Sequence, residues 1–156
     1  MNINEEIRYL ILAIQREGNR NFSEALRPLD LTPAQAEVIR ILSEIQPTTL
    51  LNLGEHLVCE SGSPSRLINR MVKNGLVEKQ PSPDDGRAIL LSLTAQGEDA
   101  LQHLDVIETA LHSAIEATIA ESGLSSKEIA NTLWQFVRDT ESGNALQRRK
   151  NHTQTP

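Results

Sequence analysis

The sequence is poor in cysteine, aromatic residues and long apolar runs, and each shortage excludes a class of protein. The single cysteine cannot form an internal disulfide. The four aromatic residues lie outside the central third of the chain, which leaves no platform there for stacking single-stranded RNA. No apolar run approaches the length that crosses a bilayer, and no basic and apolar leader begins the sequence. We expect a cytoplasmic protein without a membrane partner.

Signatures of enzymes and metal sites are scarce as well. The chain has no glycine-rich phosphate loop, nucleophile elbow or metalloprotease helix. His56 and Cys59 could form half of a metal site, but no second pair has matching spacing. His103 and His112 lie on an acidic segment, where solvated side chains explain them better than metal ligands do. We expect no catalysis, no cofactor and no bound metal.

Charge is unevenly distributed along the chain. The net charge of −6 at first argues against a nucleic-acid partner, because phosphates attract positive charge. Residues 61–93, however, contain five basic and three acidic residues, so this stretch carries a charge of +2. Residues 94–126 contain six carboxylates and neither lysine nor arginine. A polyanion is therefore expected to approach the middle of the sequence rather than its C-terminal half.

Apolar periodicity predicts a mainly α-helical protein made of one domain, residues 1–140. The helix expected near the N-terminus, within residues 1–30, is apolar nearly all round, and so small a chain has few elements to cover it. A second copy of the chain is the simplest cover, which predicts a homodimer. Helices are also expected over 95–140. Residues 141–156 lose this periodicity and are rich in polar residues, which predicts a disordered tail.

The central residues 31–94 have the pattern of a winged helix-turn-helix. A short helix is expected over about 49–58, followed by a turn that contains glycine. Ser63 can then cap, and Pro64 can begin, a second helix that ends at Asn74. Two helices joined by a short turn form a helix-turn-helix, whose second helix enters the major groove of DNA.

The outer face of this second helix has the donors that DNA recognition requires. Its apolar residues share one face, and its polar side chains share the other. Arg66 and Arg70 can bond guanine acceptors or phosphates, and Asn69 can pair with adenine. The predicted DNA-binding residues are Ser63, Ser65, Arg66, Asn69, Arg70, Lys73 and, beyond the helix, Arg87.

Alternating apolar residues predict two β-strands after the helix, over about 76–80 and 89–93. A two-stranded ribbon in this position is a wing. Arg87 at its tip can enter the narrow minor groove, and Asp84 or Asp85 can fix the direction of its guanidinium. A polar helix face or a turn of this kind is ordinary by itself. Their order and spacing together favour DNA binding.

Two other functions fit part of the pattern. A winged helix used for protein contacts would not need basic side chains that face one ligand together. An architectural DNA-binding protein would use them without sequence preference. The prediction that fits all the features is a sequence-specific transcriptional regulator, acting as a homodimeric repressor on a near-palindromic operator in double-stranded DNA.

Several segments resemble the MarR (multiple antibiotic resistance regulator) family of bacterial transcription factors. These segments are 31–35, 65–77, 85–87 and 93–97, and the resemblance covers nearly the whole chain. The last segment, Leu-Thr-Ala-Gln-Gly, is the most specific match. The resemblance implies a winged helix over 31–94 between dimerisation helices, 1–30 and 95–140, that intertwine with those of a second copy.

The resemblance also implies how such a regulator leaves DNA. Members of this family often act as repressors that are released from DNA by small aromatic or phenolic ligands, or by oxidation of a cysteine. Cys59 is the redox candidate, although a reactive thiol needs a positive neighbour and Glu60 is acidic. The residues that would bind a small effector cannot be identified from the sequence. Ser82 stands where many members have Asp, which predicts a wing tip ordered by fewer charges.

Overall fold

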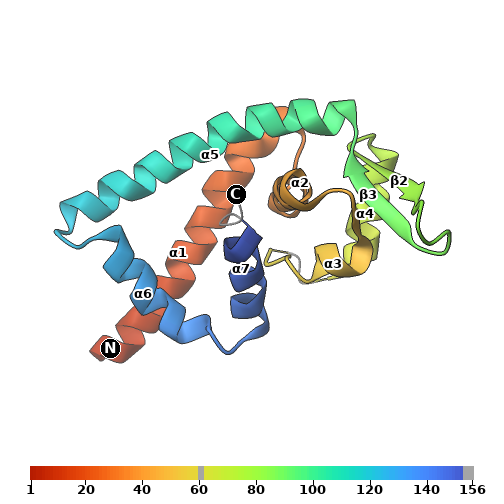
Figure 1. Ribbon diagram of the computed structural model, residues 1–156. Helices are drawn as coiled ribbons and strands as arrows, with labels where there is room; N and C mark the ends of the chain where they lie inside the picture. The colour runs from red at the N-terminus through yellow and green to blue at the C-terminus, as the bar shows by residue number, and fades with distance from the viewer. Residues whose placement is uncertain (60–61, 153–156) are drawn as a thin grey trace.

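The computed structural model describes residues 1–59 and 62–152 as a helical protein with a small antiparallel sheet (Figure 1). The helices are α1 (Ile3–Leu26), α2 (Pro33–Ile45), α3 (Leu50–Gly54), α4 (Pro64–Lys73), α5 (Ala95–Glu121), α6 (Ser126–Val137) and α7 (Glu141–His152), with a 3-10 turn, η1 (Arg27–Leu29), after α1. The strands are β1 (Thr48–Thr49), β2 (Val77–Pro81) and β3 (Ile89–Leu93). This arrangement confirms the predicted winged helix between flanking helices.

Two predictions fall partly outside the described residues. The turn predicted at 59–62 contains Glu60 and Ser61, and the predicted tail ends with residues 153–156, none of which the structure describes. Within the described ranges, no helix is both long and apolar enough to cross a membrane.

The sheet has the strand order β1-β3-β2, in which β2 and β3 form the predicted wing. Their register runs from Val77 opposite Leu93 to Pro81 opposite Ile89. The sequence did not predict β1, because two residues are too few to show a periodic pattern. The helix expected over 49–58 was also too long, since β1 takes its first residue and α3 ends at Gly54.

The hydrophobic core lies around α2. This helix begins with a capping box, which the spacing of Thr32 and Gln35 in the sequence predicts: the Gln35 amide donates to Thr32 Oγ1 (3.3 Å), and the Thr32 amide donates to Gln35 Oε1 (2.9 Å). Fully buried side chains come from the last turn of α1, from α2, α3, α4, the sheet and the first half of α5, namely Leu26, Val38, Ile39, Ile41, Leu42, Leu53, Ile68, Met71, Val77, Leu91 and Leu104. Arg40 on α2 also bonds the Asp105 and Glu108 carboxylates of α5. The winged helix and the first half of α5 therefore pack as one unit.

By contrast, α1 and α6 extend away from this core (Figure 1). Many of their apolar side chains are exposed. Leu26 at its last turn is the buried residue of α1. The exposed apolar residues of α1 include Ile3, Ile7, Leu10, Ile11 and Ile14, which are 41–70% exposed, and Leu133 and Phe136 of α6 are 51% and 62% exposed. These two helices have the surface expected of an unpartnered dimer interface.

The structure differs from the predicted disordered tail, because residues 141–152 form helix α7. Thr140 caps this helix by accepting a hydrogen bond from the Gly143 amide (3.1 Å). Arg148 then donates to the Glu55 carbonyl oxygen of the winged helix (3.1 Å). Polar contacts and the two small buried residues Gly143 and Ala145 hold α7 in place, and a search for apolar periodicity could not find such a helix.

Thr94 joins the end of α4, the wing and the start of α5. Its hydroxyl accepts a hydrogen bond from the Gly97 amide (3.1 Å) and donates one to the Gly75 carbonyl oxygen, while its own amide donates to the Leu76 carbonyl oxygen (3.1 Å). Gly75 has a φ of 75°, in the left-handed region that favours glycine. This junction fixes the direction in which α5 leaves the winged helix.

The junction has no room for a side chain at Gly97. A Cβ there would clash with the Leu76 carbonyl oxygen and lie 3.2 Å from the Leu93 side chain. We expect Gly97→Ala to lower the free energy of unfolding by about 1–3 kcal/mol, since the backbone must shift. As a control, Gly18→Ala in α1 meets nothing within 4 Å and should raise stability by about 0.5–1 kcal/mol. Denaturant titration measures both, and a Gly97→Ala protein as stable as the unmodified one contradicts the prediction.

Candidate nucleic-acid interface

Helix α4 divides its residues between the core and solvent as the sequence predicted. Leu67, Ile68 and Met71 are buried. The exposed residues are Ser65, Arg66, Asn69, Arg70 and Lys73, which are five of the predicted DNA-binding residues. The helix contains no acidic side chain to oppose a phosphate backbone. Its outer face therefore presents amide and cationic donors together, as a recognition helix requires.

Ser63 occupies the N-cap position of α4, but its side chain makes no capping hydrogen bond. Its carbonyl oxygen accepts from the amides of Arg66 (3.0 Å) and Leu67 (3.2 Å), and Pro64 takes the first helical position. Ser63 thus stands at the predicted N-cap position, but its hydroxyl does not form the predicted capping hydrogen bond. The exposed hydroxyl lies at a helix N-terminus, where phosphate groups bind favourably.

Lys79 is a residue that the sequence analysis missed. It lies on β2, and its Nζ donates to Asn69 Oδ1 on α4 (2.7 Å). Strand alternation was the signal that could have found it, since Lys79 follows the buried Val77 by two residues and shares its side of the ribbon. The wing strand and the recognition helix therefore meet through their polar side chains as well as through the core.

The wing tip is ordered by hydrogen bonds to its backbone. Ser82 Oγ accepts from the amides of Asp84 (3.3 Å) and Asp85 (3.4 Å), and the Ser82 amide donates to the Ala88 carbonyl oxygen (2.8 Å). The Asp85 carboxylate accepts from the Arg87 amide (3.0 Å). A neutral serine hydroxyl thus organises the backbone of the tip at the position where many family members have Asp.

The predicted ion pair at the wing tip is absent from the described residues. Neither Asp84 nor Asp85 lies within salt-bridge distance of the Arg87 guanidinium. Asp85 orients the backbone of Arg87 rather than its side chain, because the carboxylate is already bonded to the amide. The guanidinium of Arg87 is exposed at the tip.

The segment in front of α4 is held by a buried carboxylate. Glu37 of α2 is 7% exposed, and its oxygens accept from the backbone amides of Val58 (2.9 Å) and Cys59 (2.7 Å). Arg149 of α7 donates to the same carboxylate (3.0 Å). The charge of Glu37 is therefore compensated by three donors from two distant parts of the chain.

This environment suppresses the ionisation of Cys59. Although the residue is exposed as a whole, desolvation of the thiol and the nearby Glu37 carboxylate raise its pKa to about 11. Arg149 acts in the opposite direction with a smaller effect. The thiolate is the reactive form of cysteine, so the structure gives Cys59 the surroundings of an unreactive thiol.

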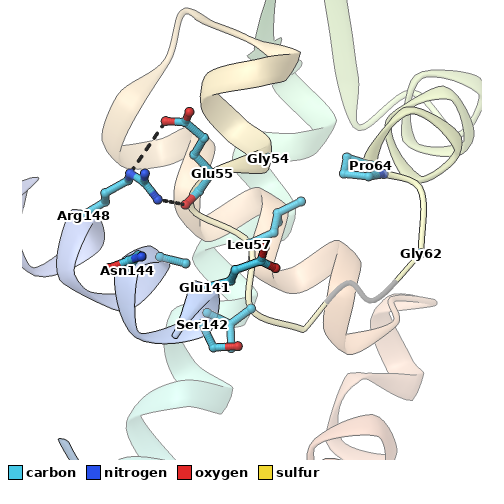
Figure 2. A pocket seen from close by; sticks show the side chains of 11 residues that line it. Gly54, Glu55, Leu57, Gly62, Pro64, Glu141, Ser142, Asn144 and Arg148 are labelled. Carbon is cyan, nitrogen blue, oxygen red and sulfur yellow. Dashed lines mark hydrogen bonds and ion pairs between the residues drawn. The ribbon is translucent and has the colours of Figure 1, made fainter. Parts of the chain in front are cut away.

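A cavity of about 590 Å³ lies between α3, the segment before α4 and α7 (Figure 2). Figure 2 shows Arg148 beside Glu55, whose carboxylate lies 3.6 Å from the guanidinium. Apolar walls come from Leu57, Pro64 and neighbouring residues. The volume of the cavity is in the range of small-molecule sites, although more of its lining is polar than apolar.

The histidines named as possible metal ligands are separated in the structure. His56 is buried against α3, with its Nδ1 2.8 Å from the Asn52 carbonyl oxygen. His103 contacts the Asp99 carbonyl oxygen on the exposed side of α5 (2.9 Å). Over residues 1–59 and 62–152, no three His, Cys, Asp or Glu side chains come together as a metal site would require.

Comparisons with known proteins agree with this geometry. The MarR family model matches residues 31–89. The organic hydroperoxide resistance transcriptional regulator of Bacillus subtilis is 30% identical over 97 residues, which are 62% of this chain and 66% of that protein. The multiple antibiotic resistance protein MarR of Escherichia coli is 34% identical over 88 residues, 56% of this chain and 61% of that protein. The matches span a little under two thirds of these relatives' own length.

A solved structure extends the similarity to the flanking helices. A cysteine-to-serine mutant of Escherichia coli MarR complexed with operator DNA has a TM-score of 0.68 to this structure and 27% sequence identity, covering 87% of this chain and 96% of that chain. The similarity therefore includes the helices on both sides of the matched winged-helix segment. Since the motifs, the order of elements and the fold all agree, the chain belongs to the MarR family of winged-helix transcriptional regulators.

Proposed function

We propose that the protein is a sequence-specific DNA-binding regulator whose α4 enters the major groove while Arg87 reaches the adjacent minor groove. The observation that carries the proposal is the outer face of α4, where donors are exposed together and no carboxylate is present. The related structure in complex with operator DNA supports the same use of the fold. The assigned contact residues are Ser63, Ser65, Arg66, Asn69, Arg70, Lys73 and Arg87.

The active form in this proposal is a homodimer. The uncovered apolar faces of α1 and α6 supply the interface, since burying them stabilises the pair by roughly 25 cal/mol for each Å² of apolar surface removed from water. Two-fold symmetry then places two α4 helices in successive major grooves, about 10 base pairs apart, on a near-palindromic operator. The acidic α5 lies in the dimer frame together with α1 and α6.

Repression and its release complete the proposal. A small aromatic or phenolic effector is the proposed signal, and the cavity beside the segment that leads into α4 has the volume to hold one. Release by oxidation of Cys59 is less well supported, because the raised pKa of the thiol opposes thiolate formation.

Selection of bound duplexes from a random pool tests the central claim. We expect a near-palindromic consensus with two half-sites, and recovery of duplexes without a consensus would instead identify an architectural DNA-binding protein. Repeating the selection with oxidant and with a panel of phenolic acids tests release. Binding that persists under every one of these additions contradicts the effector part of the proposal.

Arg87 offers a test of the wing contact. Arg87→Ala should weaken binding to all sequences and reduce the slope of log affinity against log salt by about 1, since one phosphate-region contact is lost. Arg20→Ala is the matched control, because it removes the same charge from an exposed position on α1. Fluorescence anisotropy across a salt series measures both slopes. An unchanged slope for Arg87→Ala removes this residue from the contact set.

The dimer interface can be tested on α1. Changing both Leu10 and Ile14 to Ser should shift the mass measured by light scattering from dimer toward monomer, since both side chains are more than half exposed in the single chain. Leu51→Ser is the control, because Leu51 is 77% exposed on α3, away from the flanking helices. If the double variant keeps the mass of a dimer, α1 does not form the interface.

The reactivity of the Cys59 thiol tests whether oxidation could release the protein from DNA. The pH profile of its alkylation by iodoacetamide should rise with a midpoint near 11, because folding raises the pKa of the thiol. In denaturant the midpoint should return to about 8.5, the value for a free cysteine. A midpoint in the folded protein below that of the denatured chain would show a reactive thiol and would restore the redox route.

A further inference from the structure

We propose that Asn69 and Lys79 act as one unit that reads guanine, which makes Lys79 a specificity-determining residue. The proposal rests on the proposed function, in which α4 enters the major groove. Its basis is the hydrogen bond from Lys79 Nζ to Asn69 Oδ1 (2.7 Å), which joins β2 to the exposed face of α4.

The backbone of the wing directs Lys79 toward α4. Successive side chains of a strand point to opposite faces, so Lys79 lies on the same side as the buried Val77. In the sheet register Lys79 stands opposite Leu91, which is also buried. Glu78 and Gln80 lie on the other side, where Gln80 Nε2 donates to Glu78 Oε1 (2.8 Å). The position of Lys79 on β2 therefore places its ammonium group next to α4.

The surroundings of Lys79 leave Asn69 as its hydrogen-bond partner. No carboxylate lies within salt-bridge distance of Lys79 in the described part of the chain. The sequence of α4 contains three cationic side chains and no acidic one. Since the ammonium has three donor hydrogens and Asn69 accepts one of them, two donors are left to face a ligand.

This hydrogen bond changes what Asn69 can recognise. A free asparagine pairs with adenine by accepting from the N6 amino group and donating to N7. With its carbonyl oxygen bonded to Lys79, the side chain presents its amino group beside an ammonium group. An adenine amino group would meet a positive donor in this position, which is unfavourable.

Guanine has the complementary pattern. Its major-groove edge offers two acceptors, N7 and O6, side by side. The Asn69 amino group can donate to N7 while the Lys79 ammonium donates to O6. The adenine contact expected from the sequence alone is thereby replaced by a guanine contact, because the sequence did not show that Lys79 lies next to Asn69.

The test is binding-site selection with the full-length protein and three variants. The position read by Asn69 is the one whose preference disappears in Asn69→Ala. We expect guanine there for the unmodified protein, with a loss of about 10-fold in affinity when adenine replaces it, equivalent to roughly 1.4 kcal/mol. Lys79→Met should change this preference from guanine to adenine, since the carbonyl oxygen of Asn69 becomes free to accept.

Lys73→Met is the matched control. It removes one positive charge from the exposed end of α4 and leaves the bond between Lys79 and Asn69 in place. We expect it to lower affinity for all sequences and to keep the guanine preference. Equal thermal unfolding midpoints for the two lysine variants and the unmodified protein establish that all are folded.

A base analogue gives a second measurement on the unmodified protein. Replacing the guanine by 7-deazaguanine removes the N7 acceptor and should weaken binding several-fold, while binding by Asn69→Ala should not weaken further. Selection of adenine by the unmodified protein overturns the inference. So does a Lys79→Met protein that keeps guanine and loses affinity for all sequences alike, since Lys79 then contacts only phosphate. Absence of any consensus for the unmodified protein contradicts the proposed function itself.

Discussion

The hydrogen bonds of Thr94 are the constraint on which the rest of the structure depends. Through them one residue begins α5, holds the end of α4 at Gly75 and holds the start of the wing at Leu76. Gly97 permits this close approach because it lacks a side chain. The distance between two α4 helices in a dimer depends on the angle between α4 and α5. In the proposed dimer, a short motif at the start of α5 would therefore set the spacing of the two α4 helices.

The acidic residues of α5 differ in what they contact and in how far they lie from α4, and the net charge of the chain does not show this difference. Two of them are paired, because Arg40 of α2 bonds Asp105 and Glu108 and so fastens α5 to the winged helix. Two further carboxylates, Glu116 and Glu121, lie toward the C-terminal end of α5, which extends away from α4 (Figure 1). Separation of charge along the sequence thus becomes separation in space, and an acidic protein keeps a cationic outer face on α4.

Local rules predicted the parts of this fold that depend on neighbours in sequence. The capping box at Thr32, the two faces of α4 and the pairing of the wing all follow from spacing of a few residues. Contacts between distant residues were missed for the same reason. Arg149 and Glu37 are 112 positions apart, and no periodic pattern links them. Lys79 and Asn69 are only ten apart, yet their contact depends on how the ribbon folds back on the helix.

The two ends of α4 are held by different kinds of interaction. Its C-terminal end is fixed by backbone hydrogen bonds around Gly75 and Thr94, which need no charge. The segment before its N-terminal end is fixed by the Glu37 carboxylate, whose burial is tolerated because Arg149 and two amides compensate it. Removing one partner of such a buried pair typically costs about 3–5 kcal/mol, because the other charge is left uncompensated. The position of the helix start is therefore coupled to α7, an element that contributes no residue to the proposed DNA-binding face.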